Sequence, residues 1–229
     1  MKLIERNTMN FSERTLTVLK NFATINPSII FKPGNELRTI SPQKTIMAIA
    51  KIDDEIPSSA CVYDVSRFLS TCGLYESPNI EFHEKYFTIF EGNRKTKYVY
   101  ADPSMVFAPP DKEIKIPTND VEVEVEWSDI QAVIKASGIM QLPEIAFVGE
   151  NGICYIRAID SANATADTFS IELGKTDDTF QLIIKTDNLK LIPQKYNVTL
   201  SSKGISKFEG EFVRYFIAIE SKSTYVKGE

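Results

Sequence analysis

The sequence predicts an α+β fold of two similar domains, each with antiparallel strands and short helices. The main observation is a repeat: a helical run, a proline and an apolar strand occur in residues 19–31 and again in residues 134–147. The two runs begin 115 residues apart, and their prolines, Pro27 and Pro143, lie 116 residues apart. A near-constant offset of this size indicates two domains of about half the chain each, within the usual range of roughly 100–150 residues.

A finer repeat lies inside each half. An apolar strand end, a capping aspartate and a short amphipathic run occur at Cys61–Leu69 and again at Leu182–Leu191. Strand-rich segments follow both, at Ile80–Tyr100 and at Tyr196–Glu220. The chain therefore reads as four copies of a unit made of a strand, a short helix and a β-meander. This fourfold repeat depends on pattern more than on identity, so the twofold repeat is the main basis of the prediction.

In the first half, residues 12–24 are expected to form a helix. Ser12 can cap it, and apolar side chains at helical spacing give it one inward face. Pro27 ends this helix, and the sequence after it predicts a strand at 29–31, a turn at 32–35 and strands near 36–40 and 45–52. Asp64 is expected to cap a second short helix with Arg67 on its outer face.

The middle of the chain predicts a linker. Residues 106–117 contain three prolines, which keep the segment extended and out of a central sheet. This segment also lies at the midpoint of the repeat. We therefore expect one domain at residues 1–108, a linker at residues 109–117 and a second domain at residues 118–229.

The second half repeats the plan of the first. Val121–Glu126 alternates apolar and acidic residues, as a half-buried strand does. Ser128 and Gln131 predict a capping box for a helix over residues 128–138, with Lys135 facing outward. Tight turns are expected at 149–152 and 201–204.

Composition and the candidate catalytic residues give little support to an enzyme. The chain is 43% hydrophobic and 25% charged, which is typical of a globular protein, and it contains no cofactor or nucleotide motif. The single histidine, His83, is expected in an exposed hairpin tip, and Asp53–Glu55 in a solvated loop rather than a cation site. The cysteines have neither metal-ligand nor disulfide spacing and are expected as buried thiols: Cys61, Cys72 and Cys154.

Charge and hydropathy also indicate the cellular location and the class of partner. No apolar run reaches the roughly 18 residues that a membrane helix needs, and the N-terminus lacks an apolar signal core, so we expect a cytosolic protein with no membrane partner. The net charge is −5 and the pI about 5.2, whereas nucleic-acid-binding domains usually have a pI above about 9.

The predicted helices nevertheless share one feature that favours a weakly basic surface. Their acids lie in caps and first turns, where the helix dipole favours negative charge, and isolated basic residues occupy the outer faces. A single Lys or Arg on each helix can position phosphates without reading bases. These residues are Arg14, Lys20, Arg67, Lys135 and Lys190.

Four segments carry a resemblance to a known family: Leu19–Asn26, Ala101–Ser104, Lys207–Glu211 and Tyr215–Ser221. Tyr63-Asp64 and Phe68-Leu69 fit it as well. These segments resemble the DNA sliding clamps, and specifically the polymerase processivity factors of T-even-type bacteriophages. The resemblance covers nearly the whole chain in order, with divergent stretches at 40–57 and 75–97.

The resemblance implies two DNA-clamp domains per chain and a homotrimeric ring of six such domains around duplex DNA, with helices inside and sheets outside. A ring also explains how a protein with a negative net charge could hold DNA. Because the ring encloses the duplex, its inner surface needs to be only weakly positive. The five basic residues above would face the hole, and Lys185 is added to them. No catalysis and no cofactor are implied, and the expected place is the cytoplasm of an infected bacterial host.

The resemblance also implies partners. It predicts loading by a separate clamp loader, docking of the C-terminal peptide of the viral DNA polymerase, and assistance to late transcription through further factors. The peptide pocket is expected near the linker and the last strand, at Ile40, Ile46, Val106, Pro109, Pro110, Ile217 and Ile219. The competing interpretation is a structural, β-rich virion protein with no role on DNA, and an enzyme is a distant third.

Overall fold

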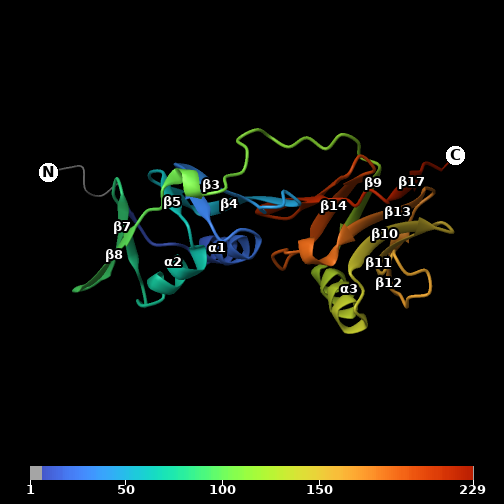
Figure 1. The fold of residues 1–229 in the computed structure, drawn as a ribbon, viewed down its shortest axis with the longest axis horizontal. Coiled ribbons are helices and arrows are strands. Elements are labelled where there is room, and N and C mark those ends of the chain that lie inside the picture. Colours follow the sequence, from blue (N-terminus) through green and yellow to red (C-terminus); the bar gives the residue numbers. More distant parts are fainter. Residues whose placement is uncertain (1–6, 229) are drawn as a thin grey trace. The chain divides into compact units, whose positions relative to one another are not determined.

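The computed structural model describes residues 7–228, so residues 1–6, on which the expectation of no signal segment depends, lie outside the described residues. The chain divides into two compact units, residues 1–111 and residues 112–229 (Figure 1). The repeat predicted two such bodies.

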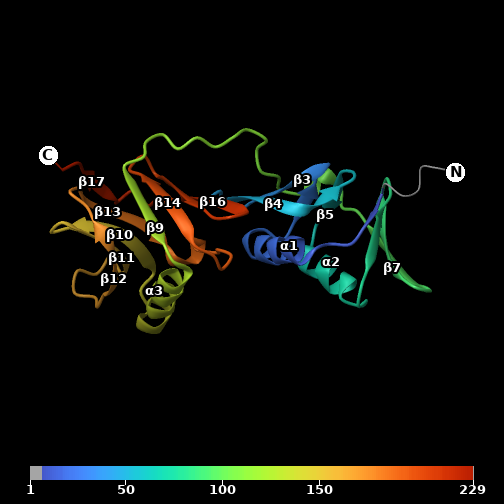
Figure 2. The ribbon, with the colours of Figure 1, turned by 180° about the vertical axis from the view of Figure 1, so that it is seen from behind.

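The first unit combines antiparallel strands with two helices that pack side by side (Figures 1 and 2). Strands β1, β6, β7 and β8 form one sheet in that order, β3 pairs with β4, and β2 pairs with β5. The helix α1 packs on β3, β4 and α2. The bounds are β1 Thr8–Met9, α1 Glu13–Ile25, β2 Ile29–Phe31, β3 Gly34–Ile40, β4 Ile46–Ile56, β5 Ala60–Val62, α2 Val65–Cys72, β6 Asn79–Phe82, β7 Tyr86–Glu91, β8 Arg94–Val99 and the 3₁₀ turn η1 Pro103–Met105.

The second unit has two antiparallel sheets and one α-helix. One sheet has the order β12-β11-β10-β13-β17, and a second run of paired strands has the order β9-β14-β15-β16. The helix α3 packs on β10, β11 and β12. The bounds are β9 Val121–Val125, α3 Trp127–Met140, β10 Glu144–Glu150, β11 Ile153–Ile159, β12 Phe169–Lys175, β13 Thr179–Lys185, the 3₁₀ turn η2 Thr186–Asn188, β14 Tyr196–Ser201, β15 Ile205–Glu209, β16 Val213–Ala218 and β17 Thr224–Val226.

The sequence repeat corresponds to equivalent strand pairs and backbone hydrogen bonds in the two units. In the first unit β2 pairs with β5, and the backbone N–H of Val65 donates to the carbonyl of Pro27 at 2.8 Å. In the second unit β10 pairs with β13, and the N–H of Thr186 donates to the carbonyl of Pro143 at 3.0 Å. Each proline follows the C-cap of a helix, so its carbonyl accepts no helical hydrogen bond and can instead tie the segment after the paired strand to the segment before the first strand.

Local sequence signals explain the first two helices. The Oγ of Ser12 accepts from the N–H of Thr15 at 3.2 Å, which caps α1, and a carboxylate oxygen of Asp64 accepts from the N–H of Arg67 at 2.8 Å, which caps α2. Behind these caps, the apolar face of each helix is buried; Phe22 and Phe68 are 1% and 0% exposed. Both predicted caps are confirmed.

The predicted fourth helix is wrong. After β13 the chain makes only the three-residue turn η2, and Leu189, Leu191 and Ile192 are buried in an extended segment. The N–H of Ile192 donates to the hydroxyl of Tyr215 at 3.1 Å, and its carbonyl accepts from the hydroxyl of Tyr196 at 2.6 Å. These side chains replace the helical hydrogen bonds, and Pro193 disfavours the helical conformation of the residue before it.

Two further local predictions need correction. The helix α3 begins at Trp127 with Glu126 as its N-cap, so Ser128 lies inside the first turn and makes no capping box. Asp53–Glu55 belongs to β4 rather than to a loop. The carboxylate of Asp54 accepts from the N–H of Ser12 at 2.8 Å, which links this strand to the start of α1.

Candidate functional site

The basic residues predicted on the first helix differ in their surroundings. The guanidinium of Arg14 donates to the carboxylate of Asp53 on β4 at 2.7 Å, and its side chain is 37% exposed. Lys20, almost two turns further along α1, is exposed and forms no ion pair with a described residue. The positive charge that α1 presents to a ligand is therefore centred on Lys20.

The second and third helices each present one exposed cation. Arg67 lies on the outer face of α2 and Lys135 on the outer face of α3. Across residues 7–228, neither side chain forms an ion pair with a carboxylate. Because no bound carboxylate has to be displaced, these cations can approach a phosphate directly.

The last two predicted cations lie outside any α-helix. Lys185 ends β13, with its ammonium 3.9 Å from the carboxylate of Glu220. Lys190 follows the η2 turn and is half-buried. Their assignment to a DNA-facing surface stays a prediction, and for Lys190 its original reason, a place on a helix, no longer holds.

A hollow beside α2 contains a cation that the sequence analysis missed. Arg67 and Lys97 of β8 line it together with Tyr63, Tyr98 and Tyr100. Burial raises the pKa of the Tyr98 phenol, opposed by the neighbouring Arg67 cation. The pattern Arg94-Lys95-Thr96-Lys97 is a signal for a basic edge strand, but nothing local to it predicts the contact with α2.

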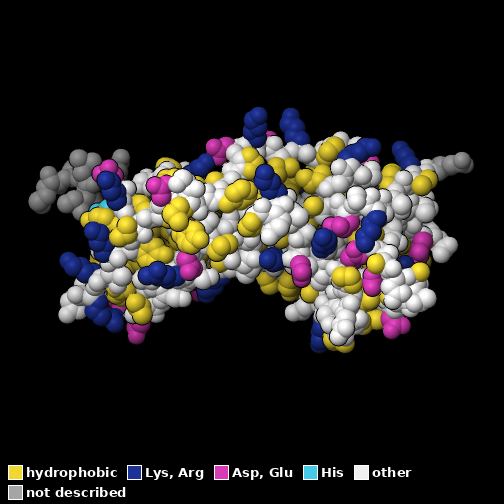
Figure 3. All heavy atoms as spheres, viewed as in Figure 1, with side chains coloured by type: hydrophobic (Ala, Val, Ile, Leu, Met, Phe, Trp, Pro, Cys, Tyr) yellow, Lys and Arg dark blue, Asp and Glu magenta, His cyan; other side chains and the backbone are white. Residues whose placement is uncertain are grey.

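On the face shown in Figure 3, the basic side chains do not gather into one dense patch. Lysine and arginine side chains are interspersed with acidic ones in both units on this face (Figure 3). Such a surface attracts an anionic polymer weakly, in keeping with a net charge of −5.

The predicted peptide pocket divides between core and surface residues. Ile40, Ile46 and Val106 are buried in the first unit, at 9%, 2% and 7% exposed. In the same unit Pro109 is half-buried and Pro110 exposed. In the second unit Ile217 lies on β16 and Ile219 just after it, and both are buried, at 0% and 7% exposed. The last strand of the chain is β17 rather than β16. The pocket assignment stays a prediction.

The first unit contains a groove that the sequence analysis did not define. We call residues 106–111 the strap, because they run without helix or strand over the β2–β3 region. The strap groove has a volume of about 200 Å³ and shares only Pro109 with the predicted pocket. Its lining residues are Ile30, Lys32, Pro33, Glu36, Arg38, Ala108, Pro109 and Asp111.

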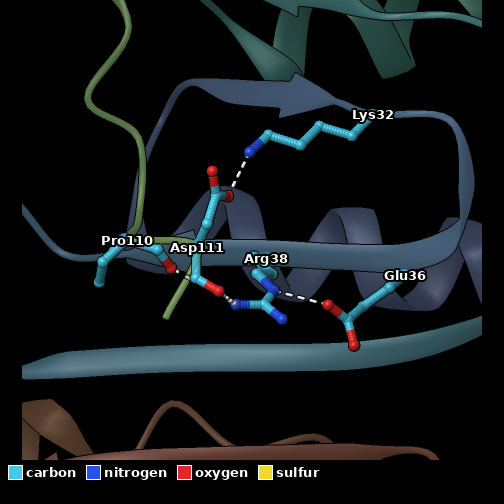
Figure 4. A network of polar contacts seen from close by, with 5 residues as sticks. All are labelled: Lys32, Glu36, Arg38, Pro110 and Asp111. Atoms are coloured by element: carbon cyan, nitrogen blue, oxygen red, sulfur yellow. Dashed lines mark hydrogen bonds and ion pairs between the residues drawn. The ribbon is translucent and has the colours of Figure 1, made fainter. Parts of the chain in front are cut away.

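Ionic contacts close one end of the strap groove (Figure 4). The ammonium of Lys32 donates to the carboxylate of Asp111. Arg38 donates to the carbonyl of Asp111 at 3.1 Å and to the carboxylate of Glu36 at 2.6 Å. The hydrogen bond from Lys32 lowers the pKa of Asp111 below its ordinary value.

The titratable residues of the described chain give no support to nucleophilic or metal chemistry. Among residues 7–228, no group of three His, Cys, Asp or Glu side chains is placed to hold a metal ion. The three cysteines are buried free thiols, and burial raises the pKa of Cys72 to about 12 and that of Cys154 to about 11. His83 lies at the β6–β7 hairpin as expected, but it is half-buried, since its ring stacks on Tyr86 at 4.4 Å.

Family comparisons agree with the two-unit fold. Residues 12–107 match the family described as DNA polymerase processivity factor, and residues 122–221 match the C-terminal family of the gp45 sliding clamp. The chain is 34% identical to the sliding clamp of Vibrio phage KVP40 over 93% of this chain and 100% of that protein. It is 33% identical to the sliding clamp of Enterobacteria phage T4 over 95% of this chain and 99% of that protein.

The fold extends to more distant proteins. The A. fulgidus PCNA structure with the C-terminal region of FEN-1 bound superposes with a TM-score of 0.70. It covers 95% of this chain and 100% of the PCNA chain at 15% identity. At that identity the likeness shows a shared fold.

These matches define the class of protein. The chain belongs to the sliding clamps. More specifically, it is a bacteriophage-type DNA polymerase processivity factor, a protein of DNA replication. The recognition made from the sequence segments is confirmed, as is the fold of two clamp domains.

Proposed function

We propose that three copies of this chain close into a ring around duplex DNA and tether the viral replicative polymerase. The observation that carries this proposal is a set of exposed cations on helices of both units that form no ion pair with any residue from 7 to 228: Lys20, Arg67 and Lys135. One such charge on each helix suits contact with phosphates at any sequence, because base edges are not read. Arg14, Lys185 and Lys190 are weaker members of this surface, since Arg14 and Lys185 face carboxylates.

Retention on DNA tests the assignment of this surface. The variant Lys20→Ala, Arg67→Ala and Lys135→Ala should leave a closed circular duplex faster than the wild-type protein, with the largest difference at low salt. Each lost phosphate contact makes the fall of log affinity with log salt less steep by about 1, so the two proteins converge as salt is raised. The measurement is the fraction of clamp that stays on DNA after loading, across a series of salt concentrations.

A matched control separates position from net charge. Lys51, Lys203 and Lys227 are exposed and lie outside the helices, so their triple change to Ala removes the same formal charge. We expect this control to be retained as the wild-type protein is. Equal losses in the two triple variants would mean that overall charge, not the helical surface, sets retention.

We further propose that partner segments dock at the strap. The observations that support this are two exposed apolar side chains, Met105 at 62% just before the strap and Phe107 at 41% within it, and the strap groove itself. The distant A. fulgidus PCNA was solved with the C-terminal region of another protein bound. The viral polymerase C-terminal peptide is the first candidate, and late-transcription factors are further ones.

The remaining parts of the proposal follow from the class. We infer domains at 1–108 and 118–229 with a linker at 109–117, loading by a separate clamp loader, no catalytic turnover, and action in the cytoplasm of the bacterial host. No helix within residues 7–228 is both long and apolar enough to cross a membrane. Assay of the purified protein for hydrolysis of ATP and of DNA would contradict the non-catalytic part if either rate exceeded the uncatalysed one.

A further inference from the structure

The strap is held at two points of different character. At its inner end the side-chain amide of Asn26, which is 3% exposed, donates to the carbonyl of Phe107 at 3.1 Å and to that of Ile40 at 3.0 Å. At its outer end the contacts are ionic and face water: the side chains of Lys32 and Asp111 are 52% and 80% exposed. The inner attachment is therefore fixed. The outer one combines a solvent-screened ion pair, which contributes little net stability, with hydrogen bonds from Arg38 to two backbone carbonyls of the strap at 3.4 and 3.1 Å.

The strap groove lies between these two attachments. Ile30, Pro33, Ala108 and Pro109 give it apolar walls, and the charged residues stand at its outer end. Pro109 and Pro110 have no N–H, so this part of the strap cannot hold itself to a strand by donating backbone hydrogen bonds. The groove can thus open on its outer side without breaking a sheet.

The charges at the outer end are balanced but not equivalent. Lys32 and Arg38 are matched by Glu36 and Asp111. Glu36 lies two residues from Arg38 on β3 and is bound to it at 2.6 Å, so it stays with its partner. Asp111 is carried by the strap, and residues 112–120 after it contain no helix or strand. Of the two carboxylates, Asp111 is the one that can leave.

We propose that Asp111 acts as a latch: an extended partner segment with an acidic side chain binds in the strap groove and takes the place of Asp111 at Lys32. This inference rests on the proposed docking of partners at the strap, and it adds both the charge of the segment and a means of regulation. The closed groove is neutral at its outer end, and release of Asp111 leaves one unmatched cation there. An acidic segment is therefore the occupant that the charges select.

A peptide taken from the chain itself provides the probe. A fluorescein-labelled peptide with the sequence of residues 105–111 and an amidated C-terminus carries the strap's own aspartate as the only charged side chain of the peptide, and the dye is common to all probes. Its binding to the full chain is measured by fluorescence anisotropy at about 50 mM and about 300 mM salt. We expect Asp111→Asn to bind this probe more tightly than the wild-type chain, by up to about tenfold, because the closed state no longer competes.

Two controls keep the result specific. Adding Lys32→Gln to Asp111→Asn should weaken binding of this probe relative to Asp111→Asn alone, and Glu76→Gln, which removes an exposed acid outside the groove, should bind as the wild-type chain does. A second probe with Asn in place of its Asp should gain by the same factor from Asp111→Asn but bind that variant more weakly than the acidic probe does, because it cannot pair with Lys32. Equal affinity of the wild-type and Asp111→Asn chains for the acidic probe, or equal affinity of the two probes for Asp111→Asn, would overturn the latch.

Failure of the latch can be told apart from failure of the proposed function. If the wild-type chain forms trimers and supports processive synthesis while the acidic probe shows no gain with Asp111→Asn, only the latch is wrong. If neither trimers nor processive synthesis is found, the proposed function itself is contradicted, whatever the peptide result.

Discussion

Glu144 shows at the level of one residue how this fold keeps a buried carboxylate charged. Its side chain is 8% exposed and bonds the ammonium of Lys222 at 2.5 Å and the backbone N–H of Ser161 at 3.0 Å. Burial acts to raise the pKa of Glu144, but the hydrogen bonds from Lys222 and Ser161 outweigh it, and the pKa lies below its ordinary value. The residue thus ties β10 to the segment before β17 and to the loop after β11.

We predict that Glu144→Gln lowers the free energy of unfolding by about 2 kcal/mol at neutral pH, because it replaces charge-assisted hydrogen bonds. Since folding lowers this pKa below the ordinary 4.5, the stabilisation is fully present above about pH 4.5 and is lost as the pH falls through the folded-state pKa. Urea unfolding of both proteins at one protein concentration, at neutral pH and near pH 3, measures the gap.

Glu172→Gln is the control for this prediction, because Glu172 is an exposed acid on β12. It should unfold as the wild-type protein does at both pH values. A gap for Glu144→Gln that does not narrow at low pH would mean that the substitution acts through packing and not through the charge.

At the level of the element, we expect the serines near the starts of two helices to contribute differently to stability. Ser12 caps α1 and also bonds the hydroxyl of the buried Thr15 at 3.1 Å, so Ser12→Ala should cost about 1 kcal/mol or more. Ser128 is exposed in the first turn of α3 and is not its cap, so Ser128→Ala should change stability by less than about 0.5 kcal/mol. Denaturant unfolding of the two variants side by side checks both values. A loss for Ser128→Ala as large as that for Ser12→Ala would restore the capping box that the sequence suggested.

The same elements show what local sequence can predict. Ser12 and Asp64 were found because a capping side chain precedes a clear apolar stripe. The short helix expected in the run that ends at Leu191 is absent because Tyr196 donates to the carbonyl of Ile192 and Tyr215 accepts from its N–H, and both tyrosines lie in later strands. Ile217 was expected in the peptide pocket, yet Tyr215, Phe216 and Ile217 are all buried.

At the level of the whole molecule, the family and the twofold plan could be predicted from the sequence, but the strap groove could not. The repeat and the family segments are read in chain order, which a sequence preserves. The strap groove depends on Lys32 and Arg38 meeting Asp111, which follows them by more than 70 residues. Neither a pattern of apolar residues nor a motif predicts that contact. The prolines therefore indicated an extended segment, but the sequence did not indicate which charged residues hold it.

The last prediction concerns assembly. Each unit leaves an edge strand at the end of a sheet: β8, with Arg94, Lys95 and Lys97, in the first, and β12 in the second. An uncovered edge invites pairing with another chain, and head-to-tail pairing of two different edges closes a ring when the rotation permits. Native mass spectrometry at micromolar concentration should therefore give a mass of three times 25.8 kDa, about 77 kDa.

Charge reversal at Lys95 and Lys97 should lower the trimer fraction more than the same change at Lys51 and Lys203, which lie on other strands or turns. A monomer at every concentration, or a dimer, would contradict the three-chain ring, and large DNA-independent assemblies would favour a structural virion protein.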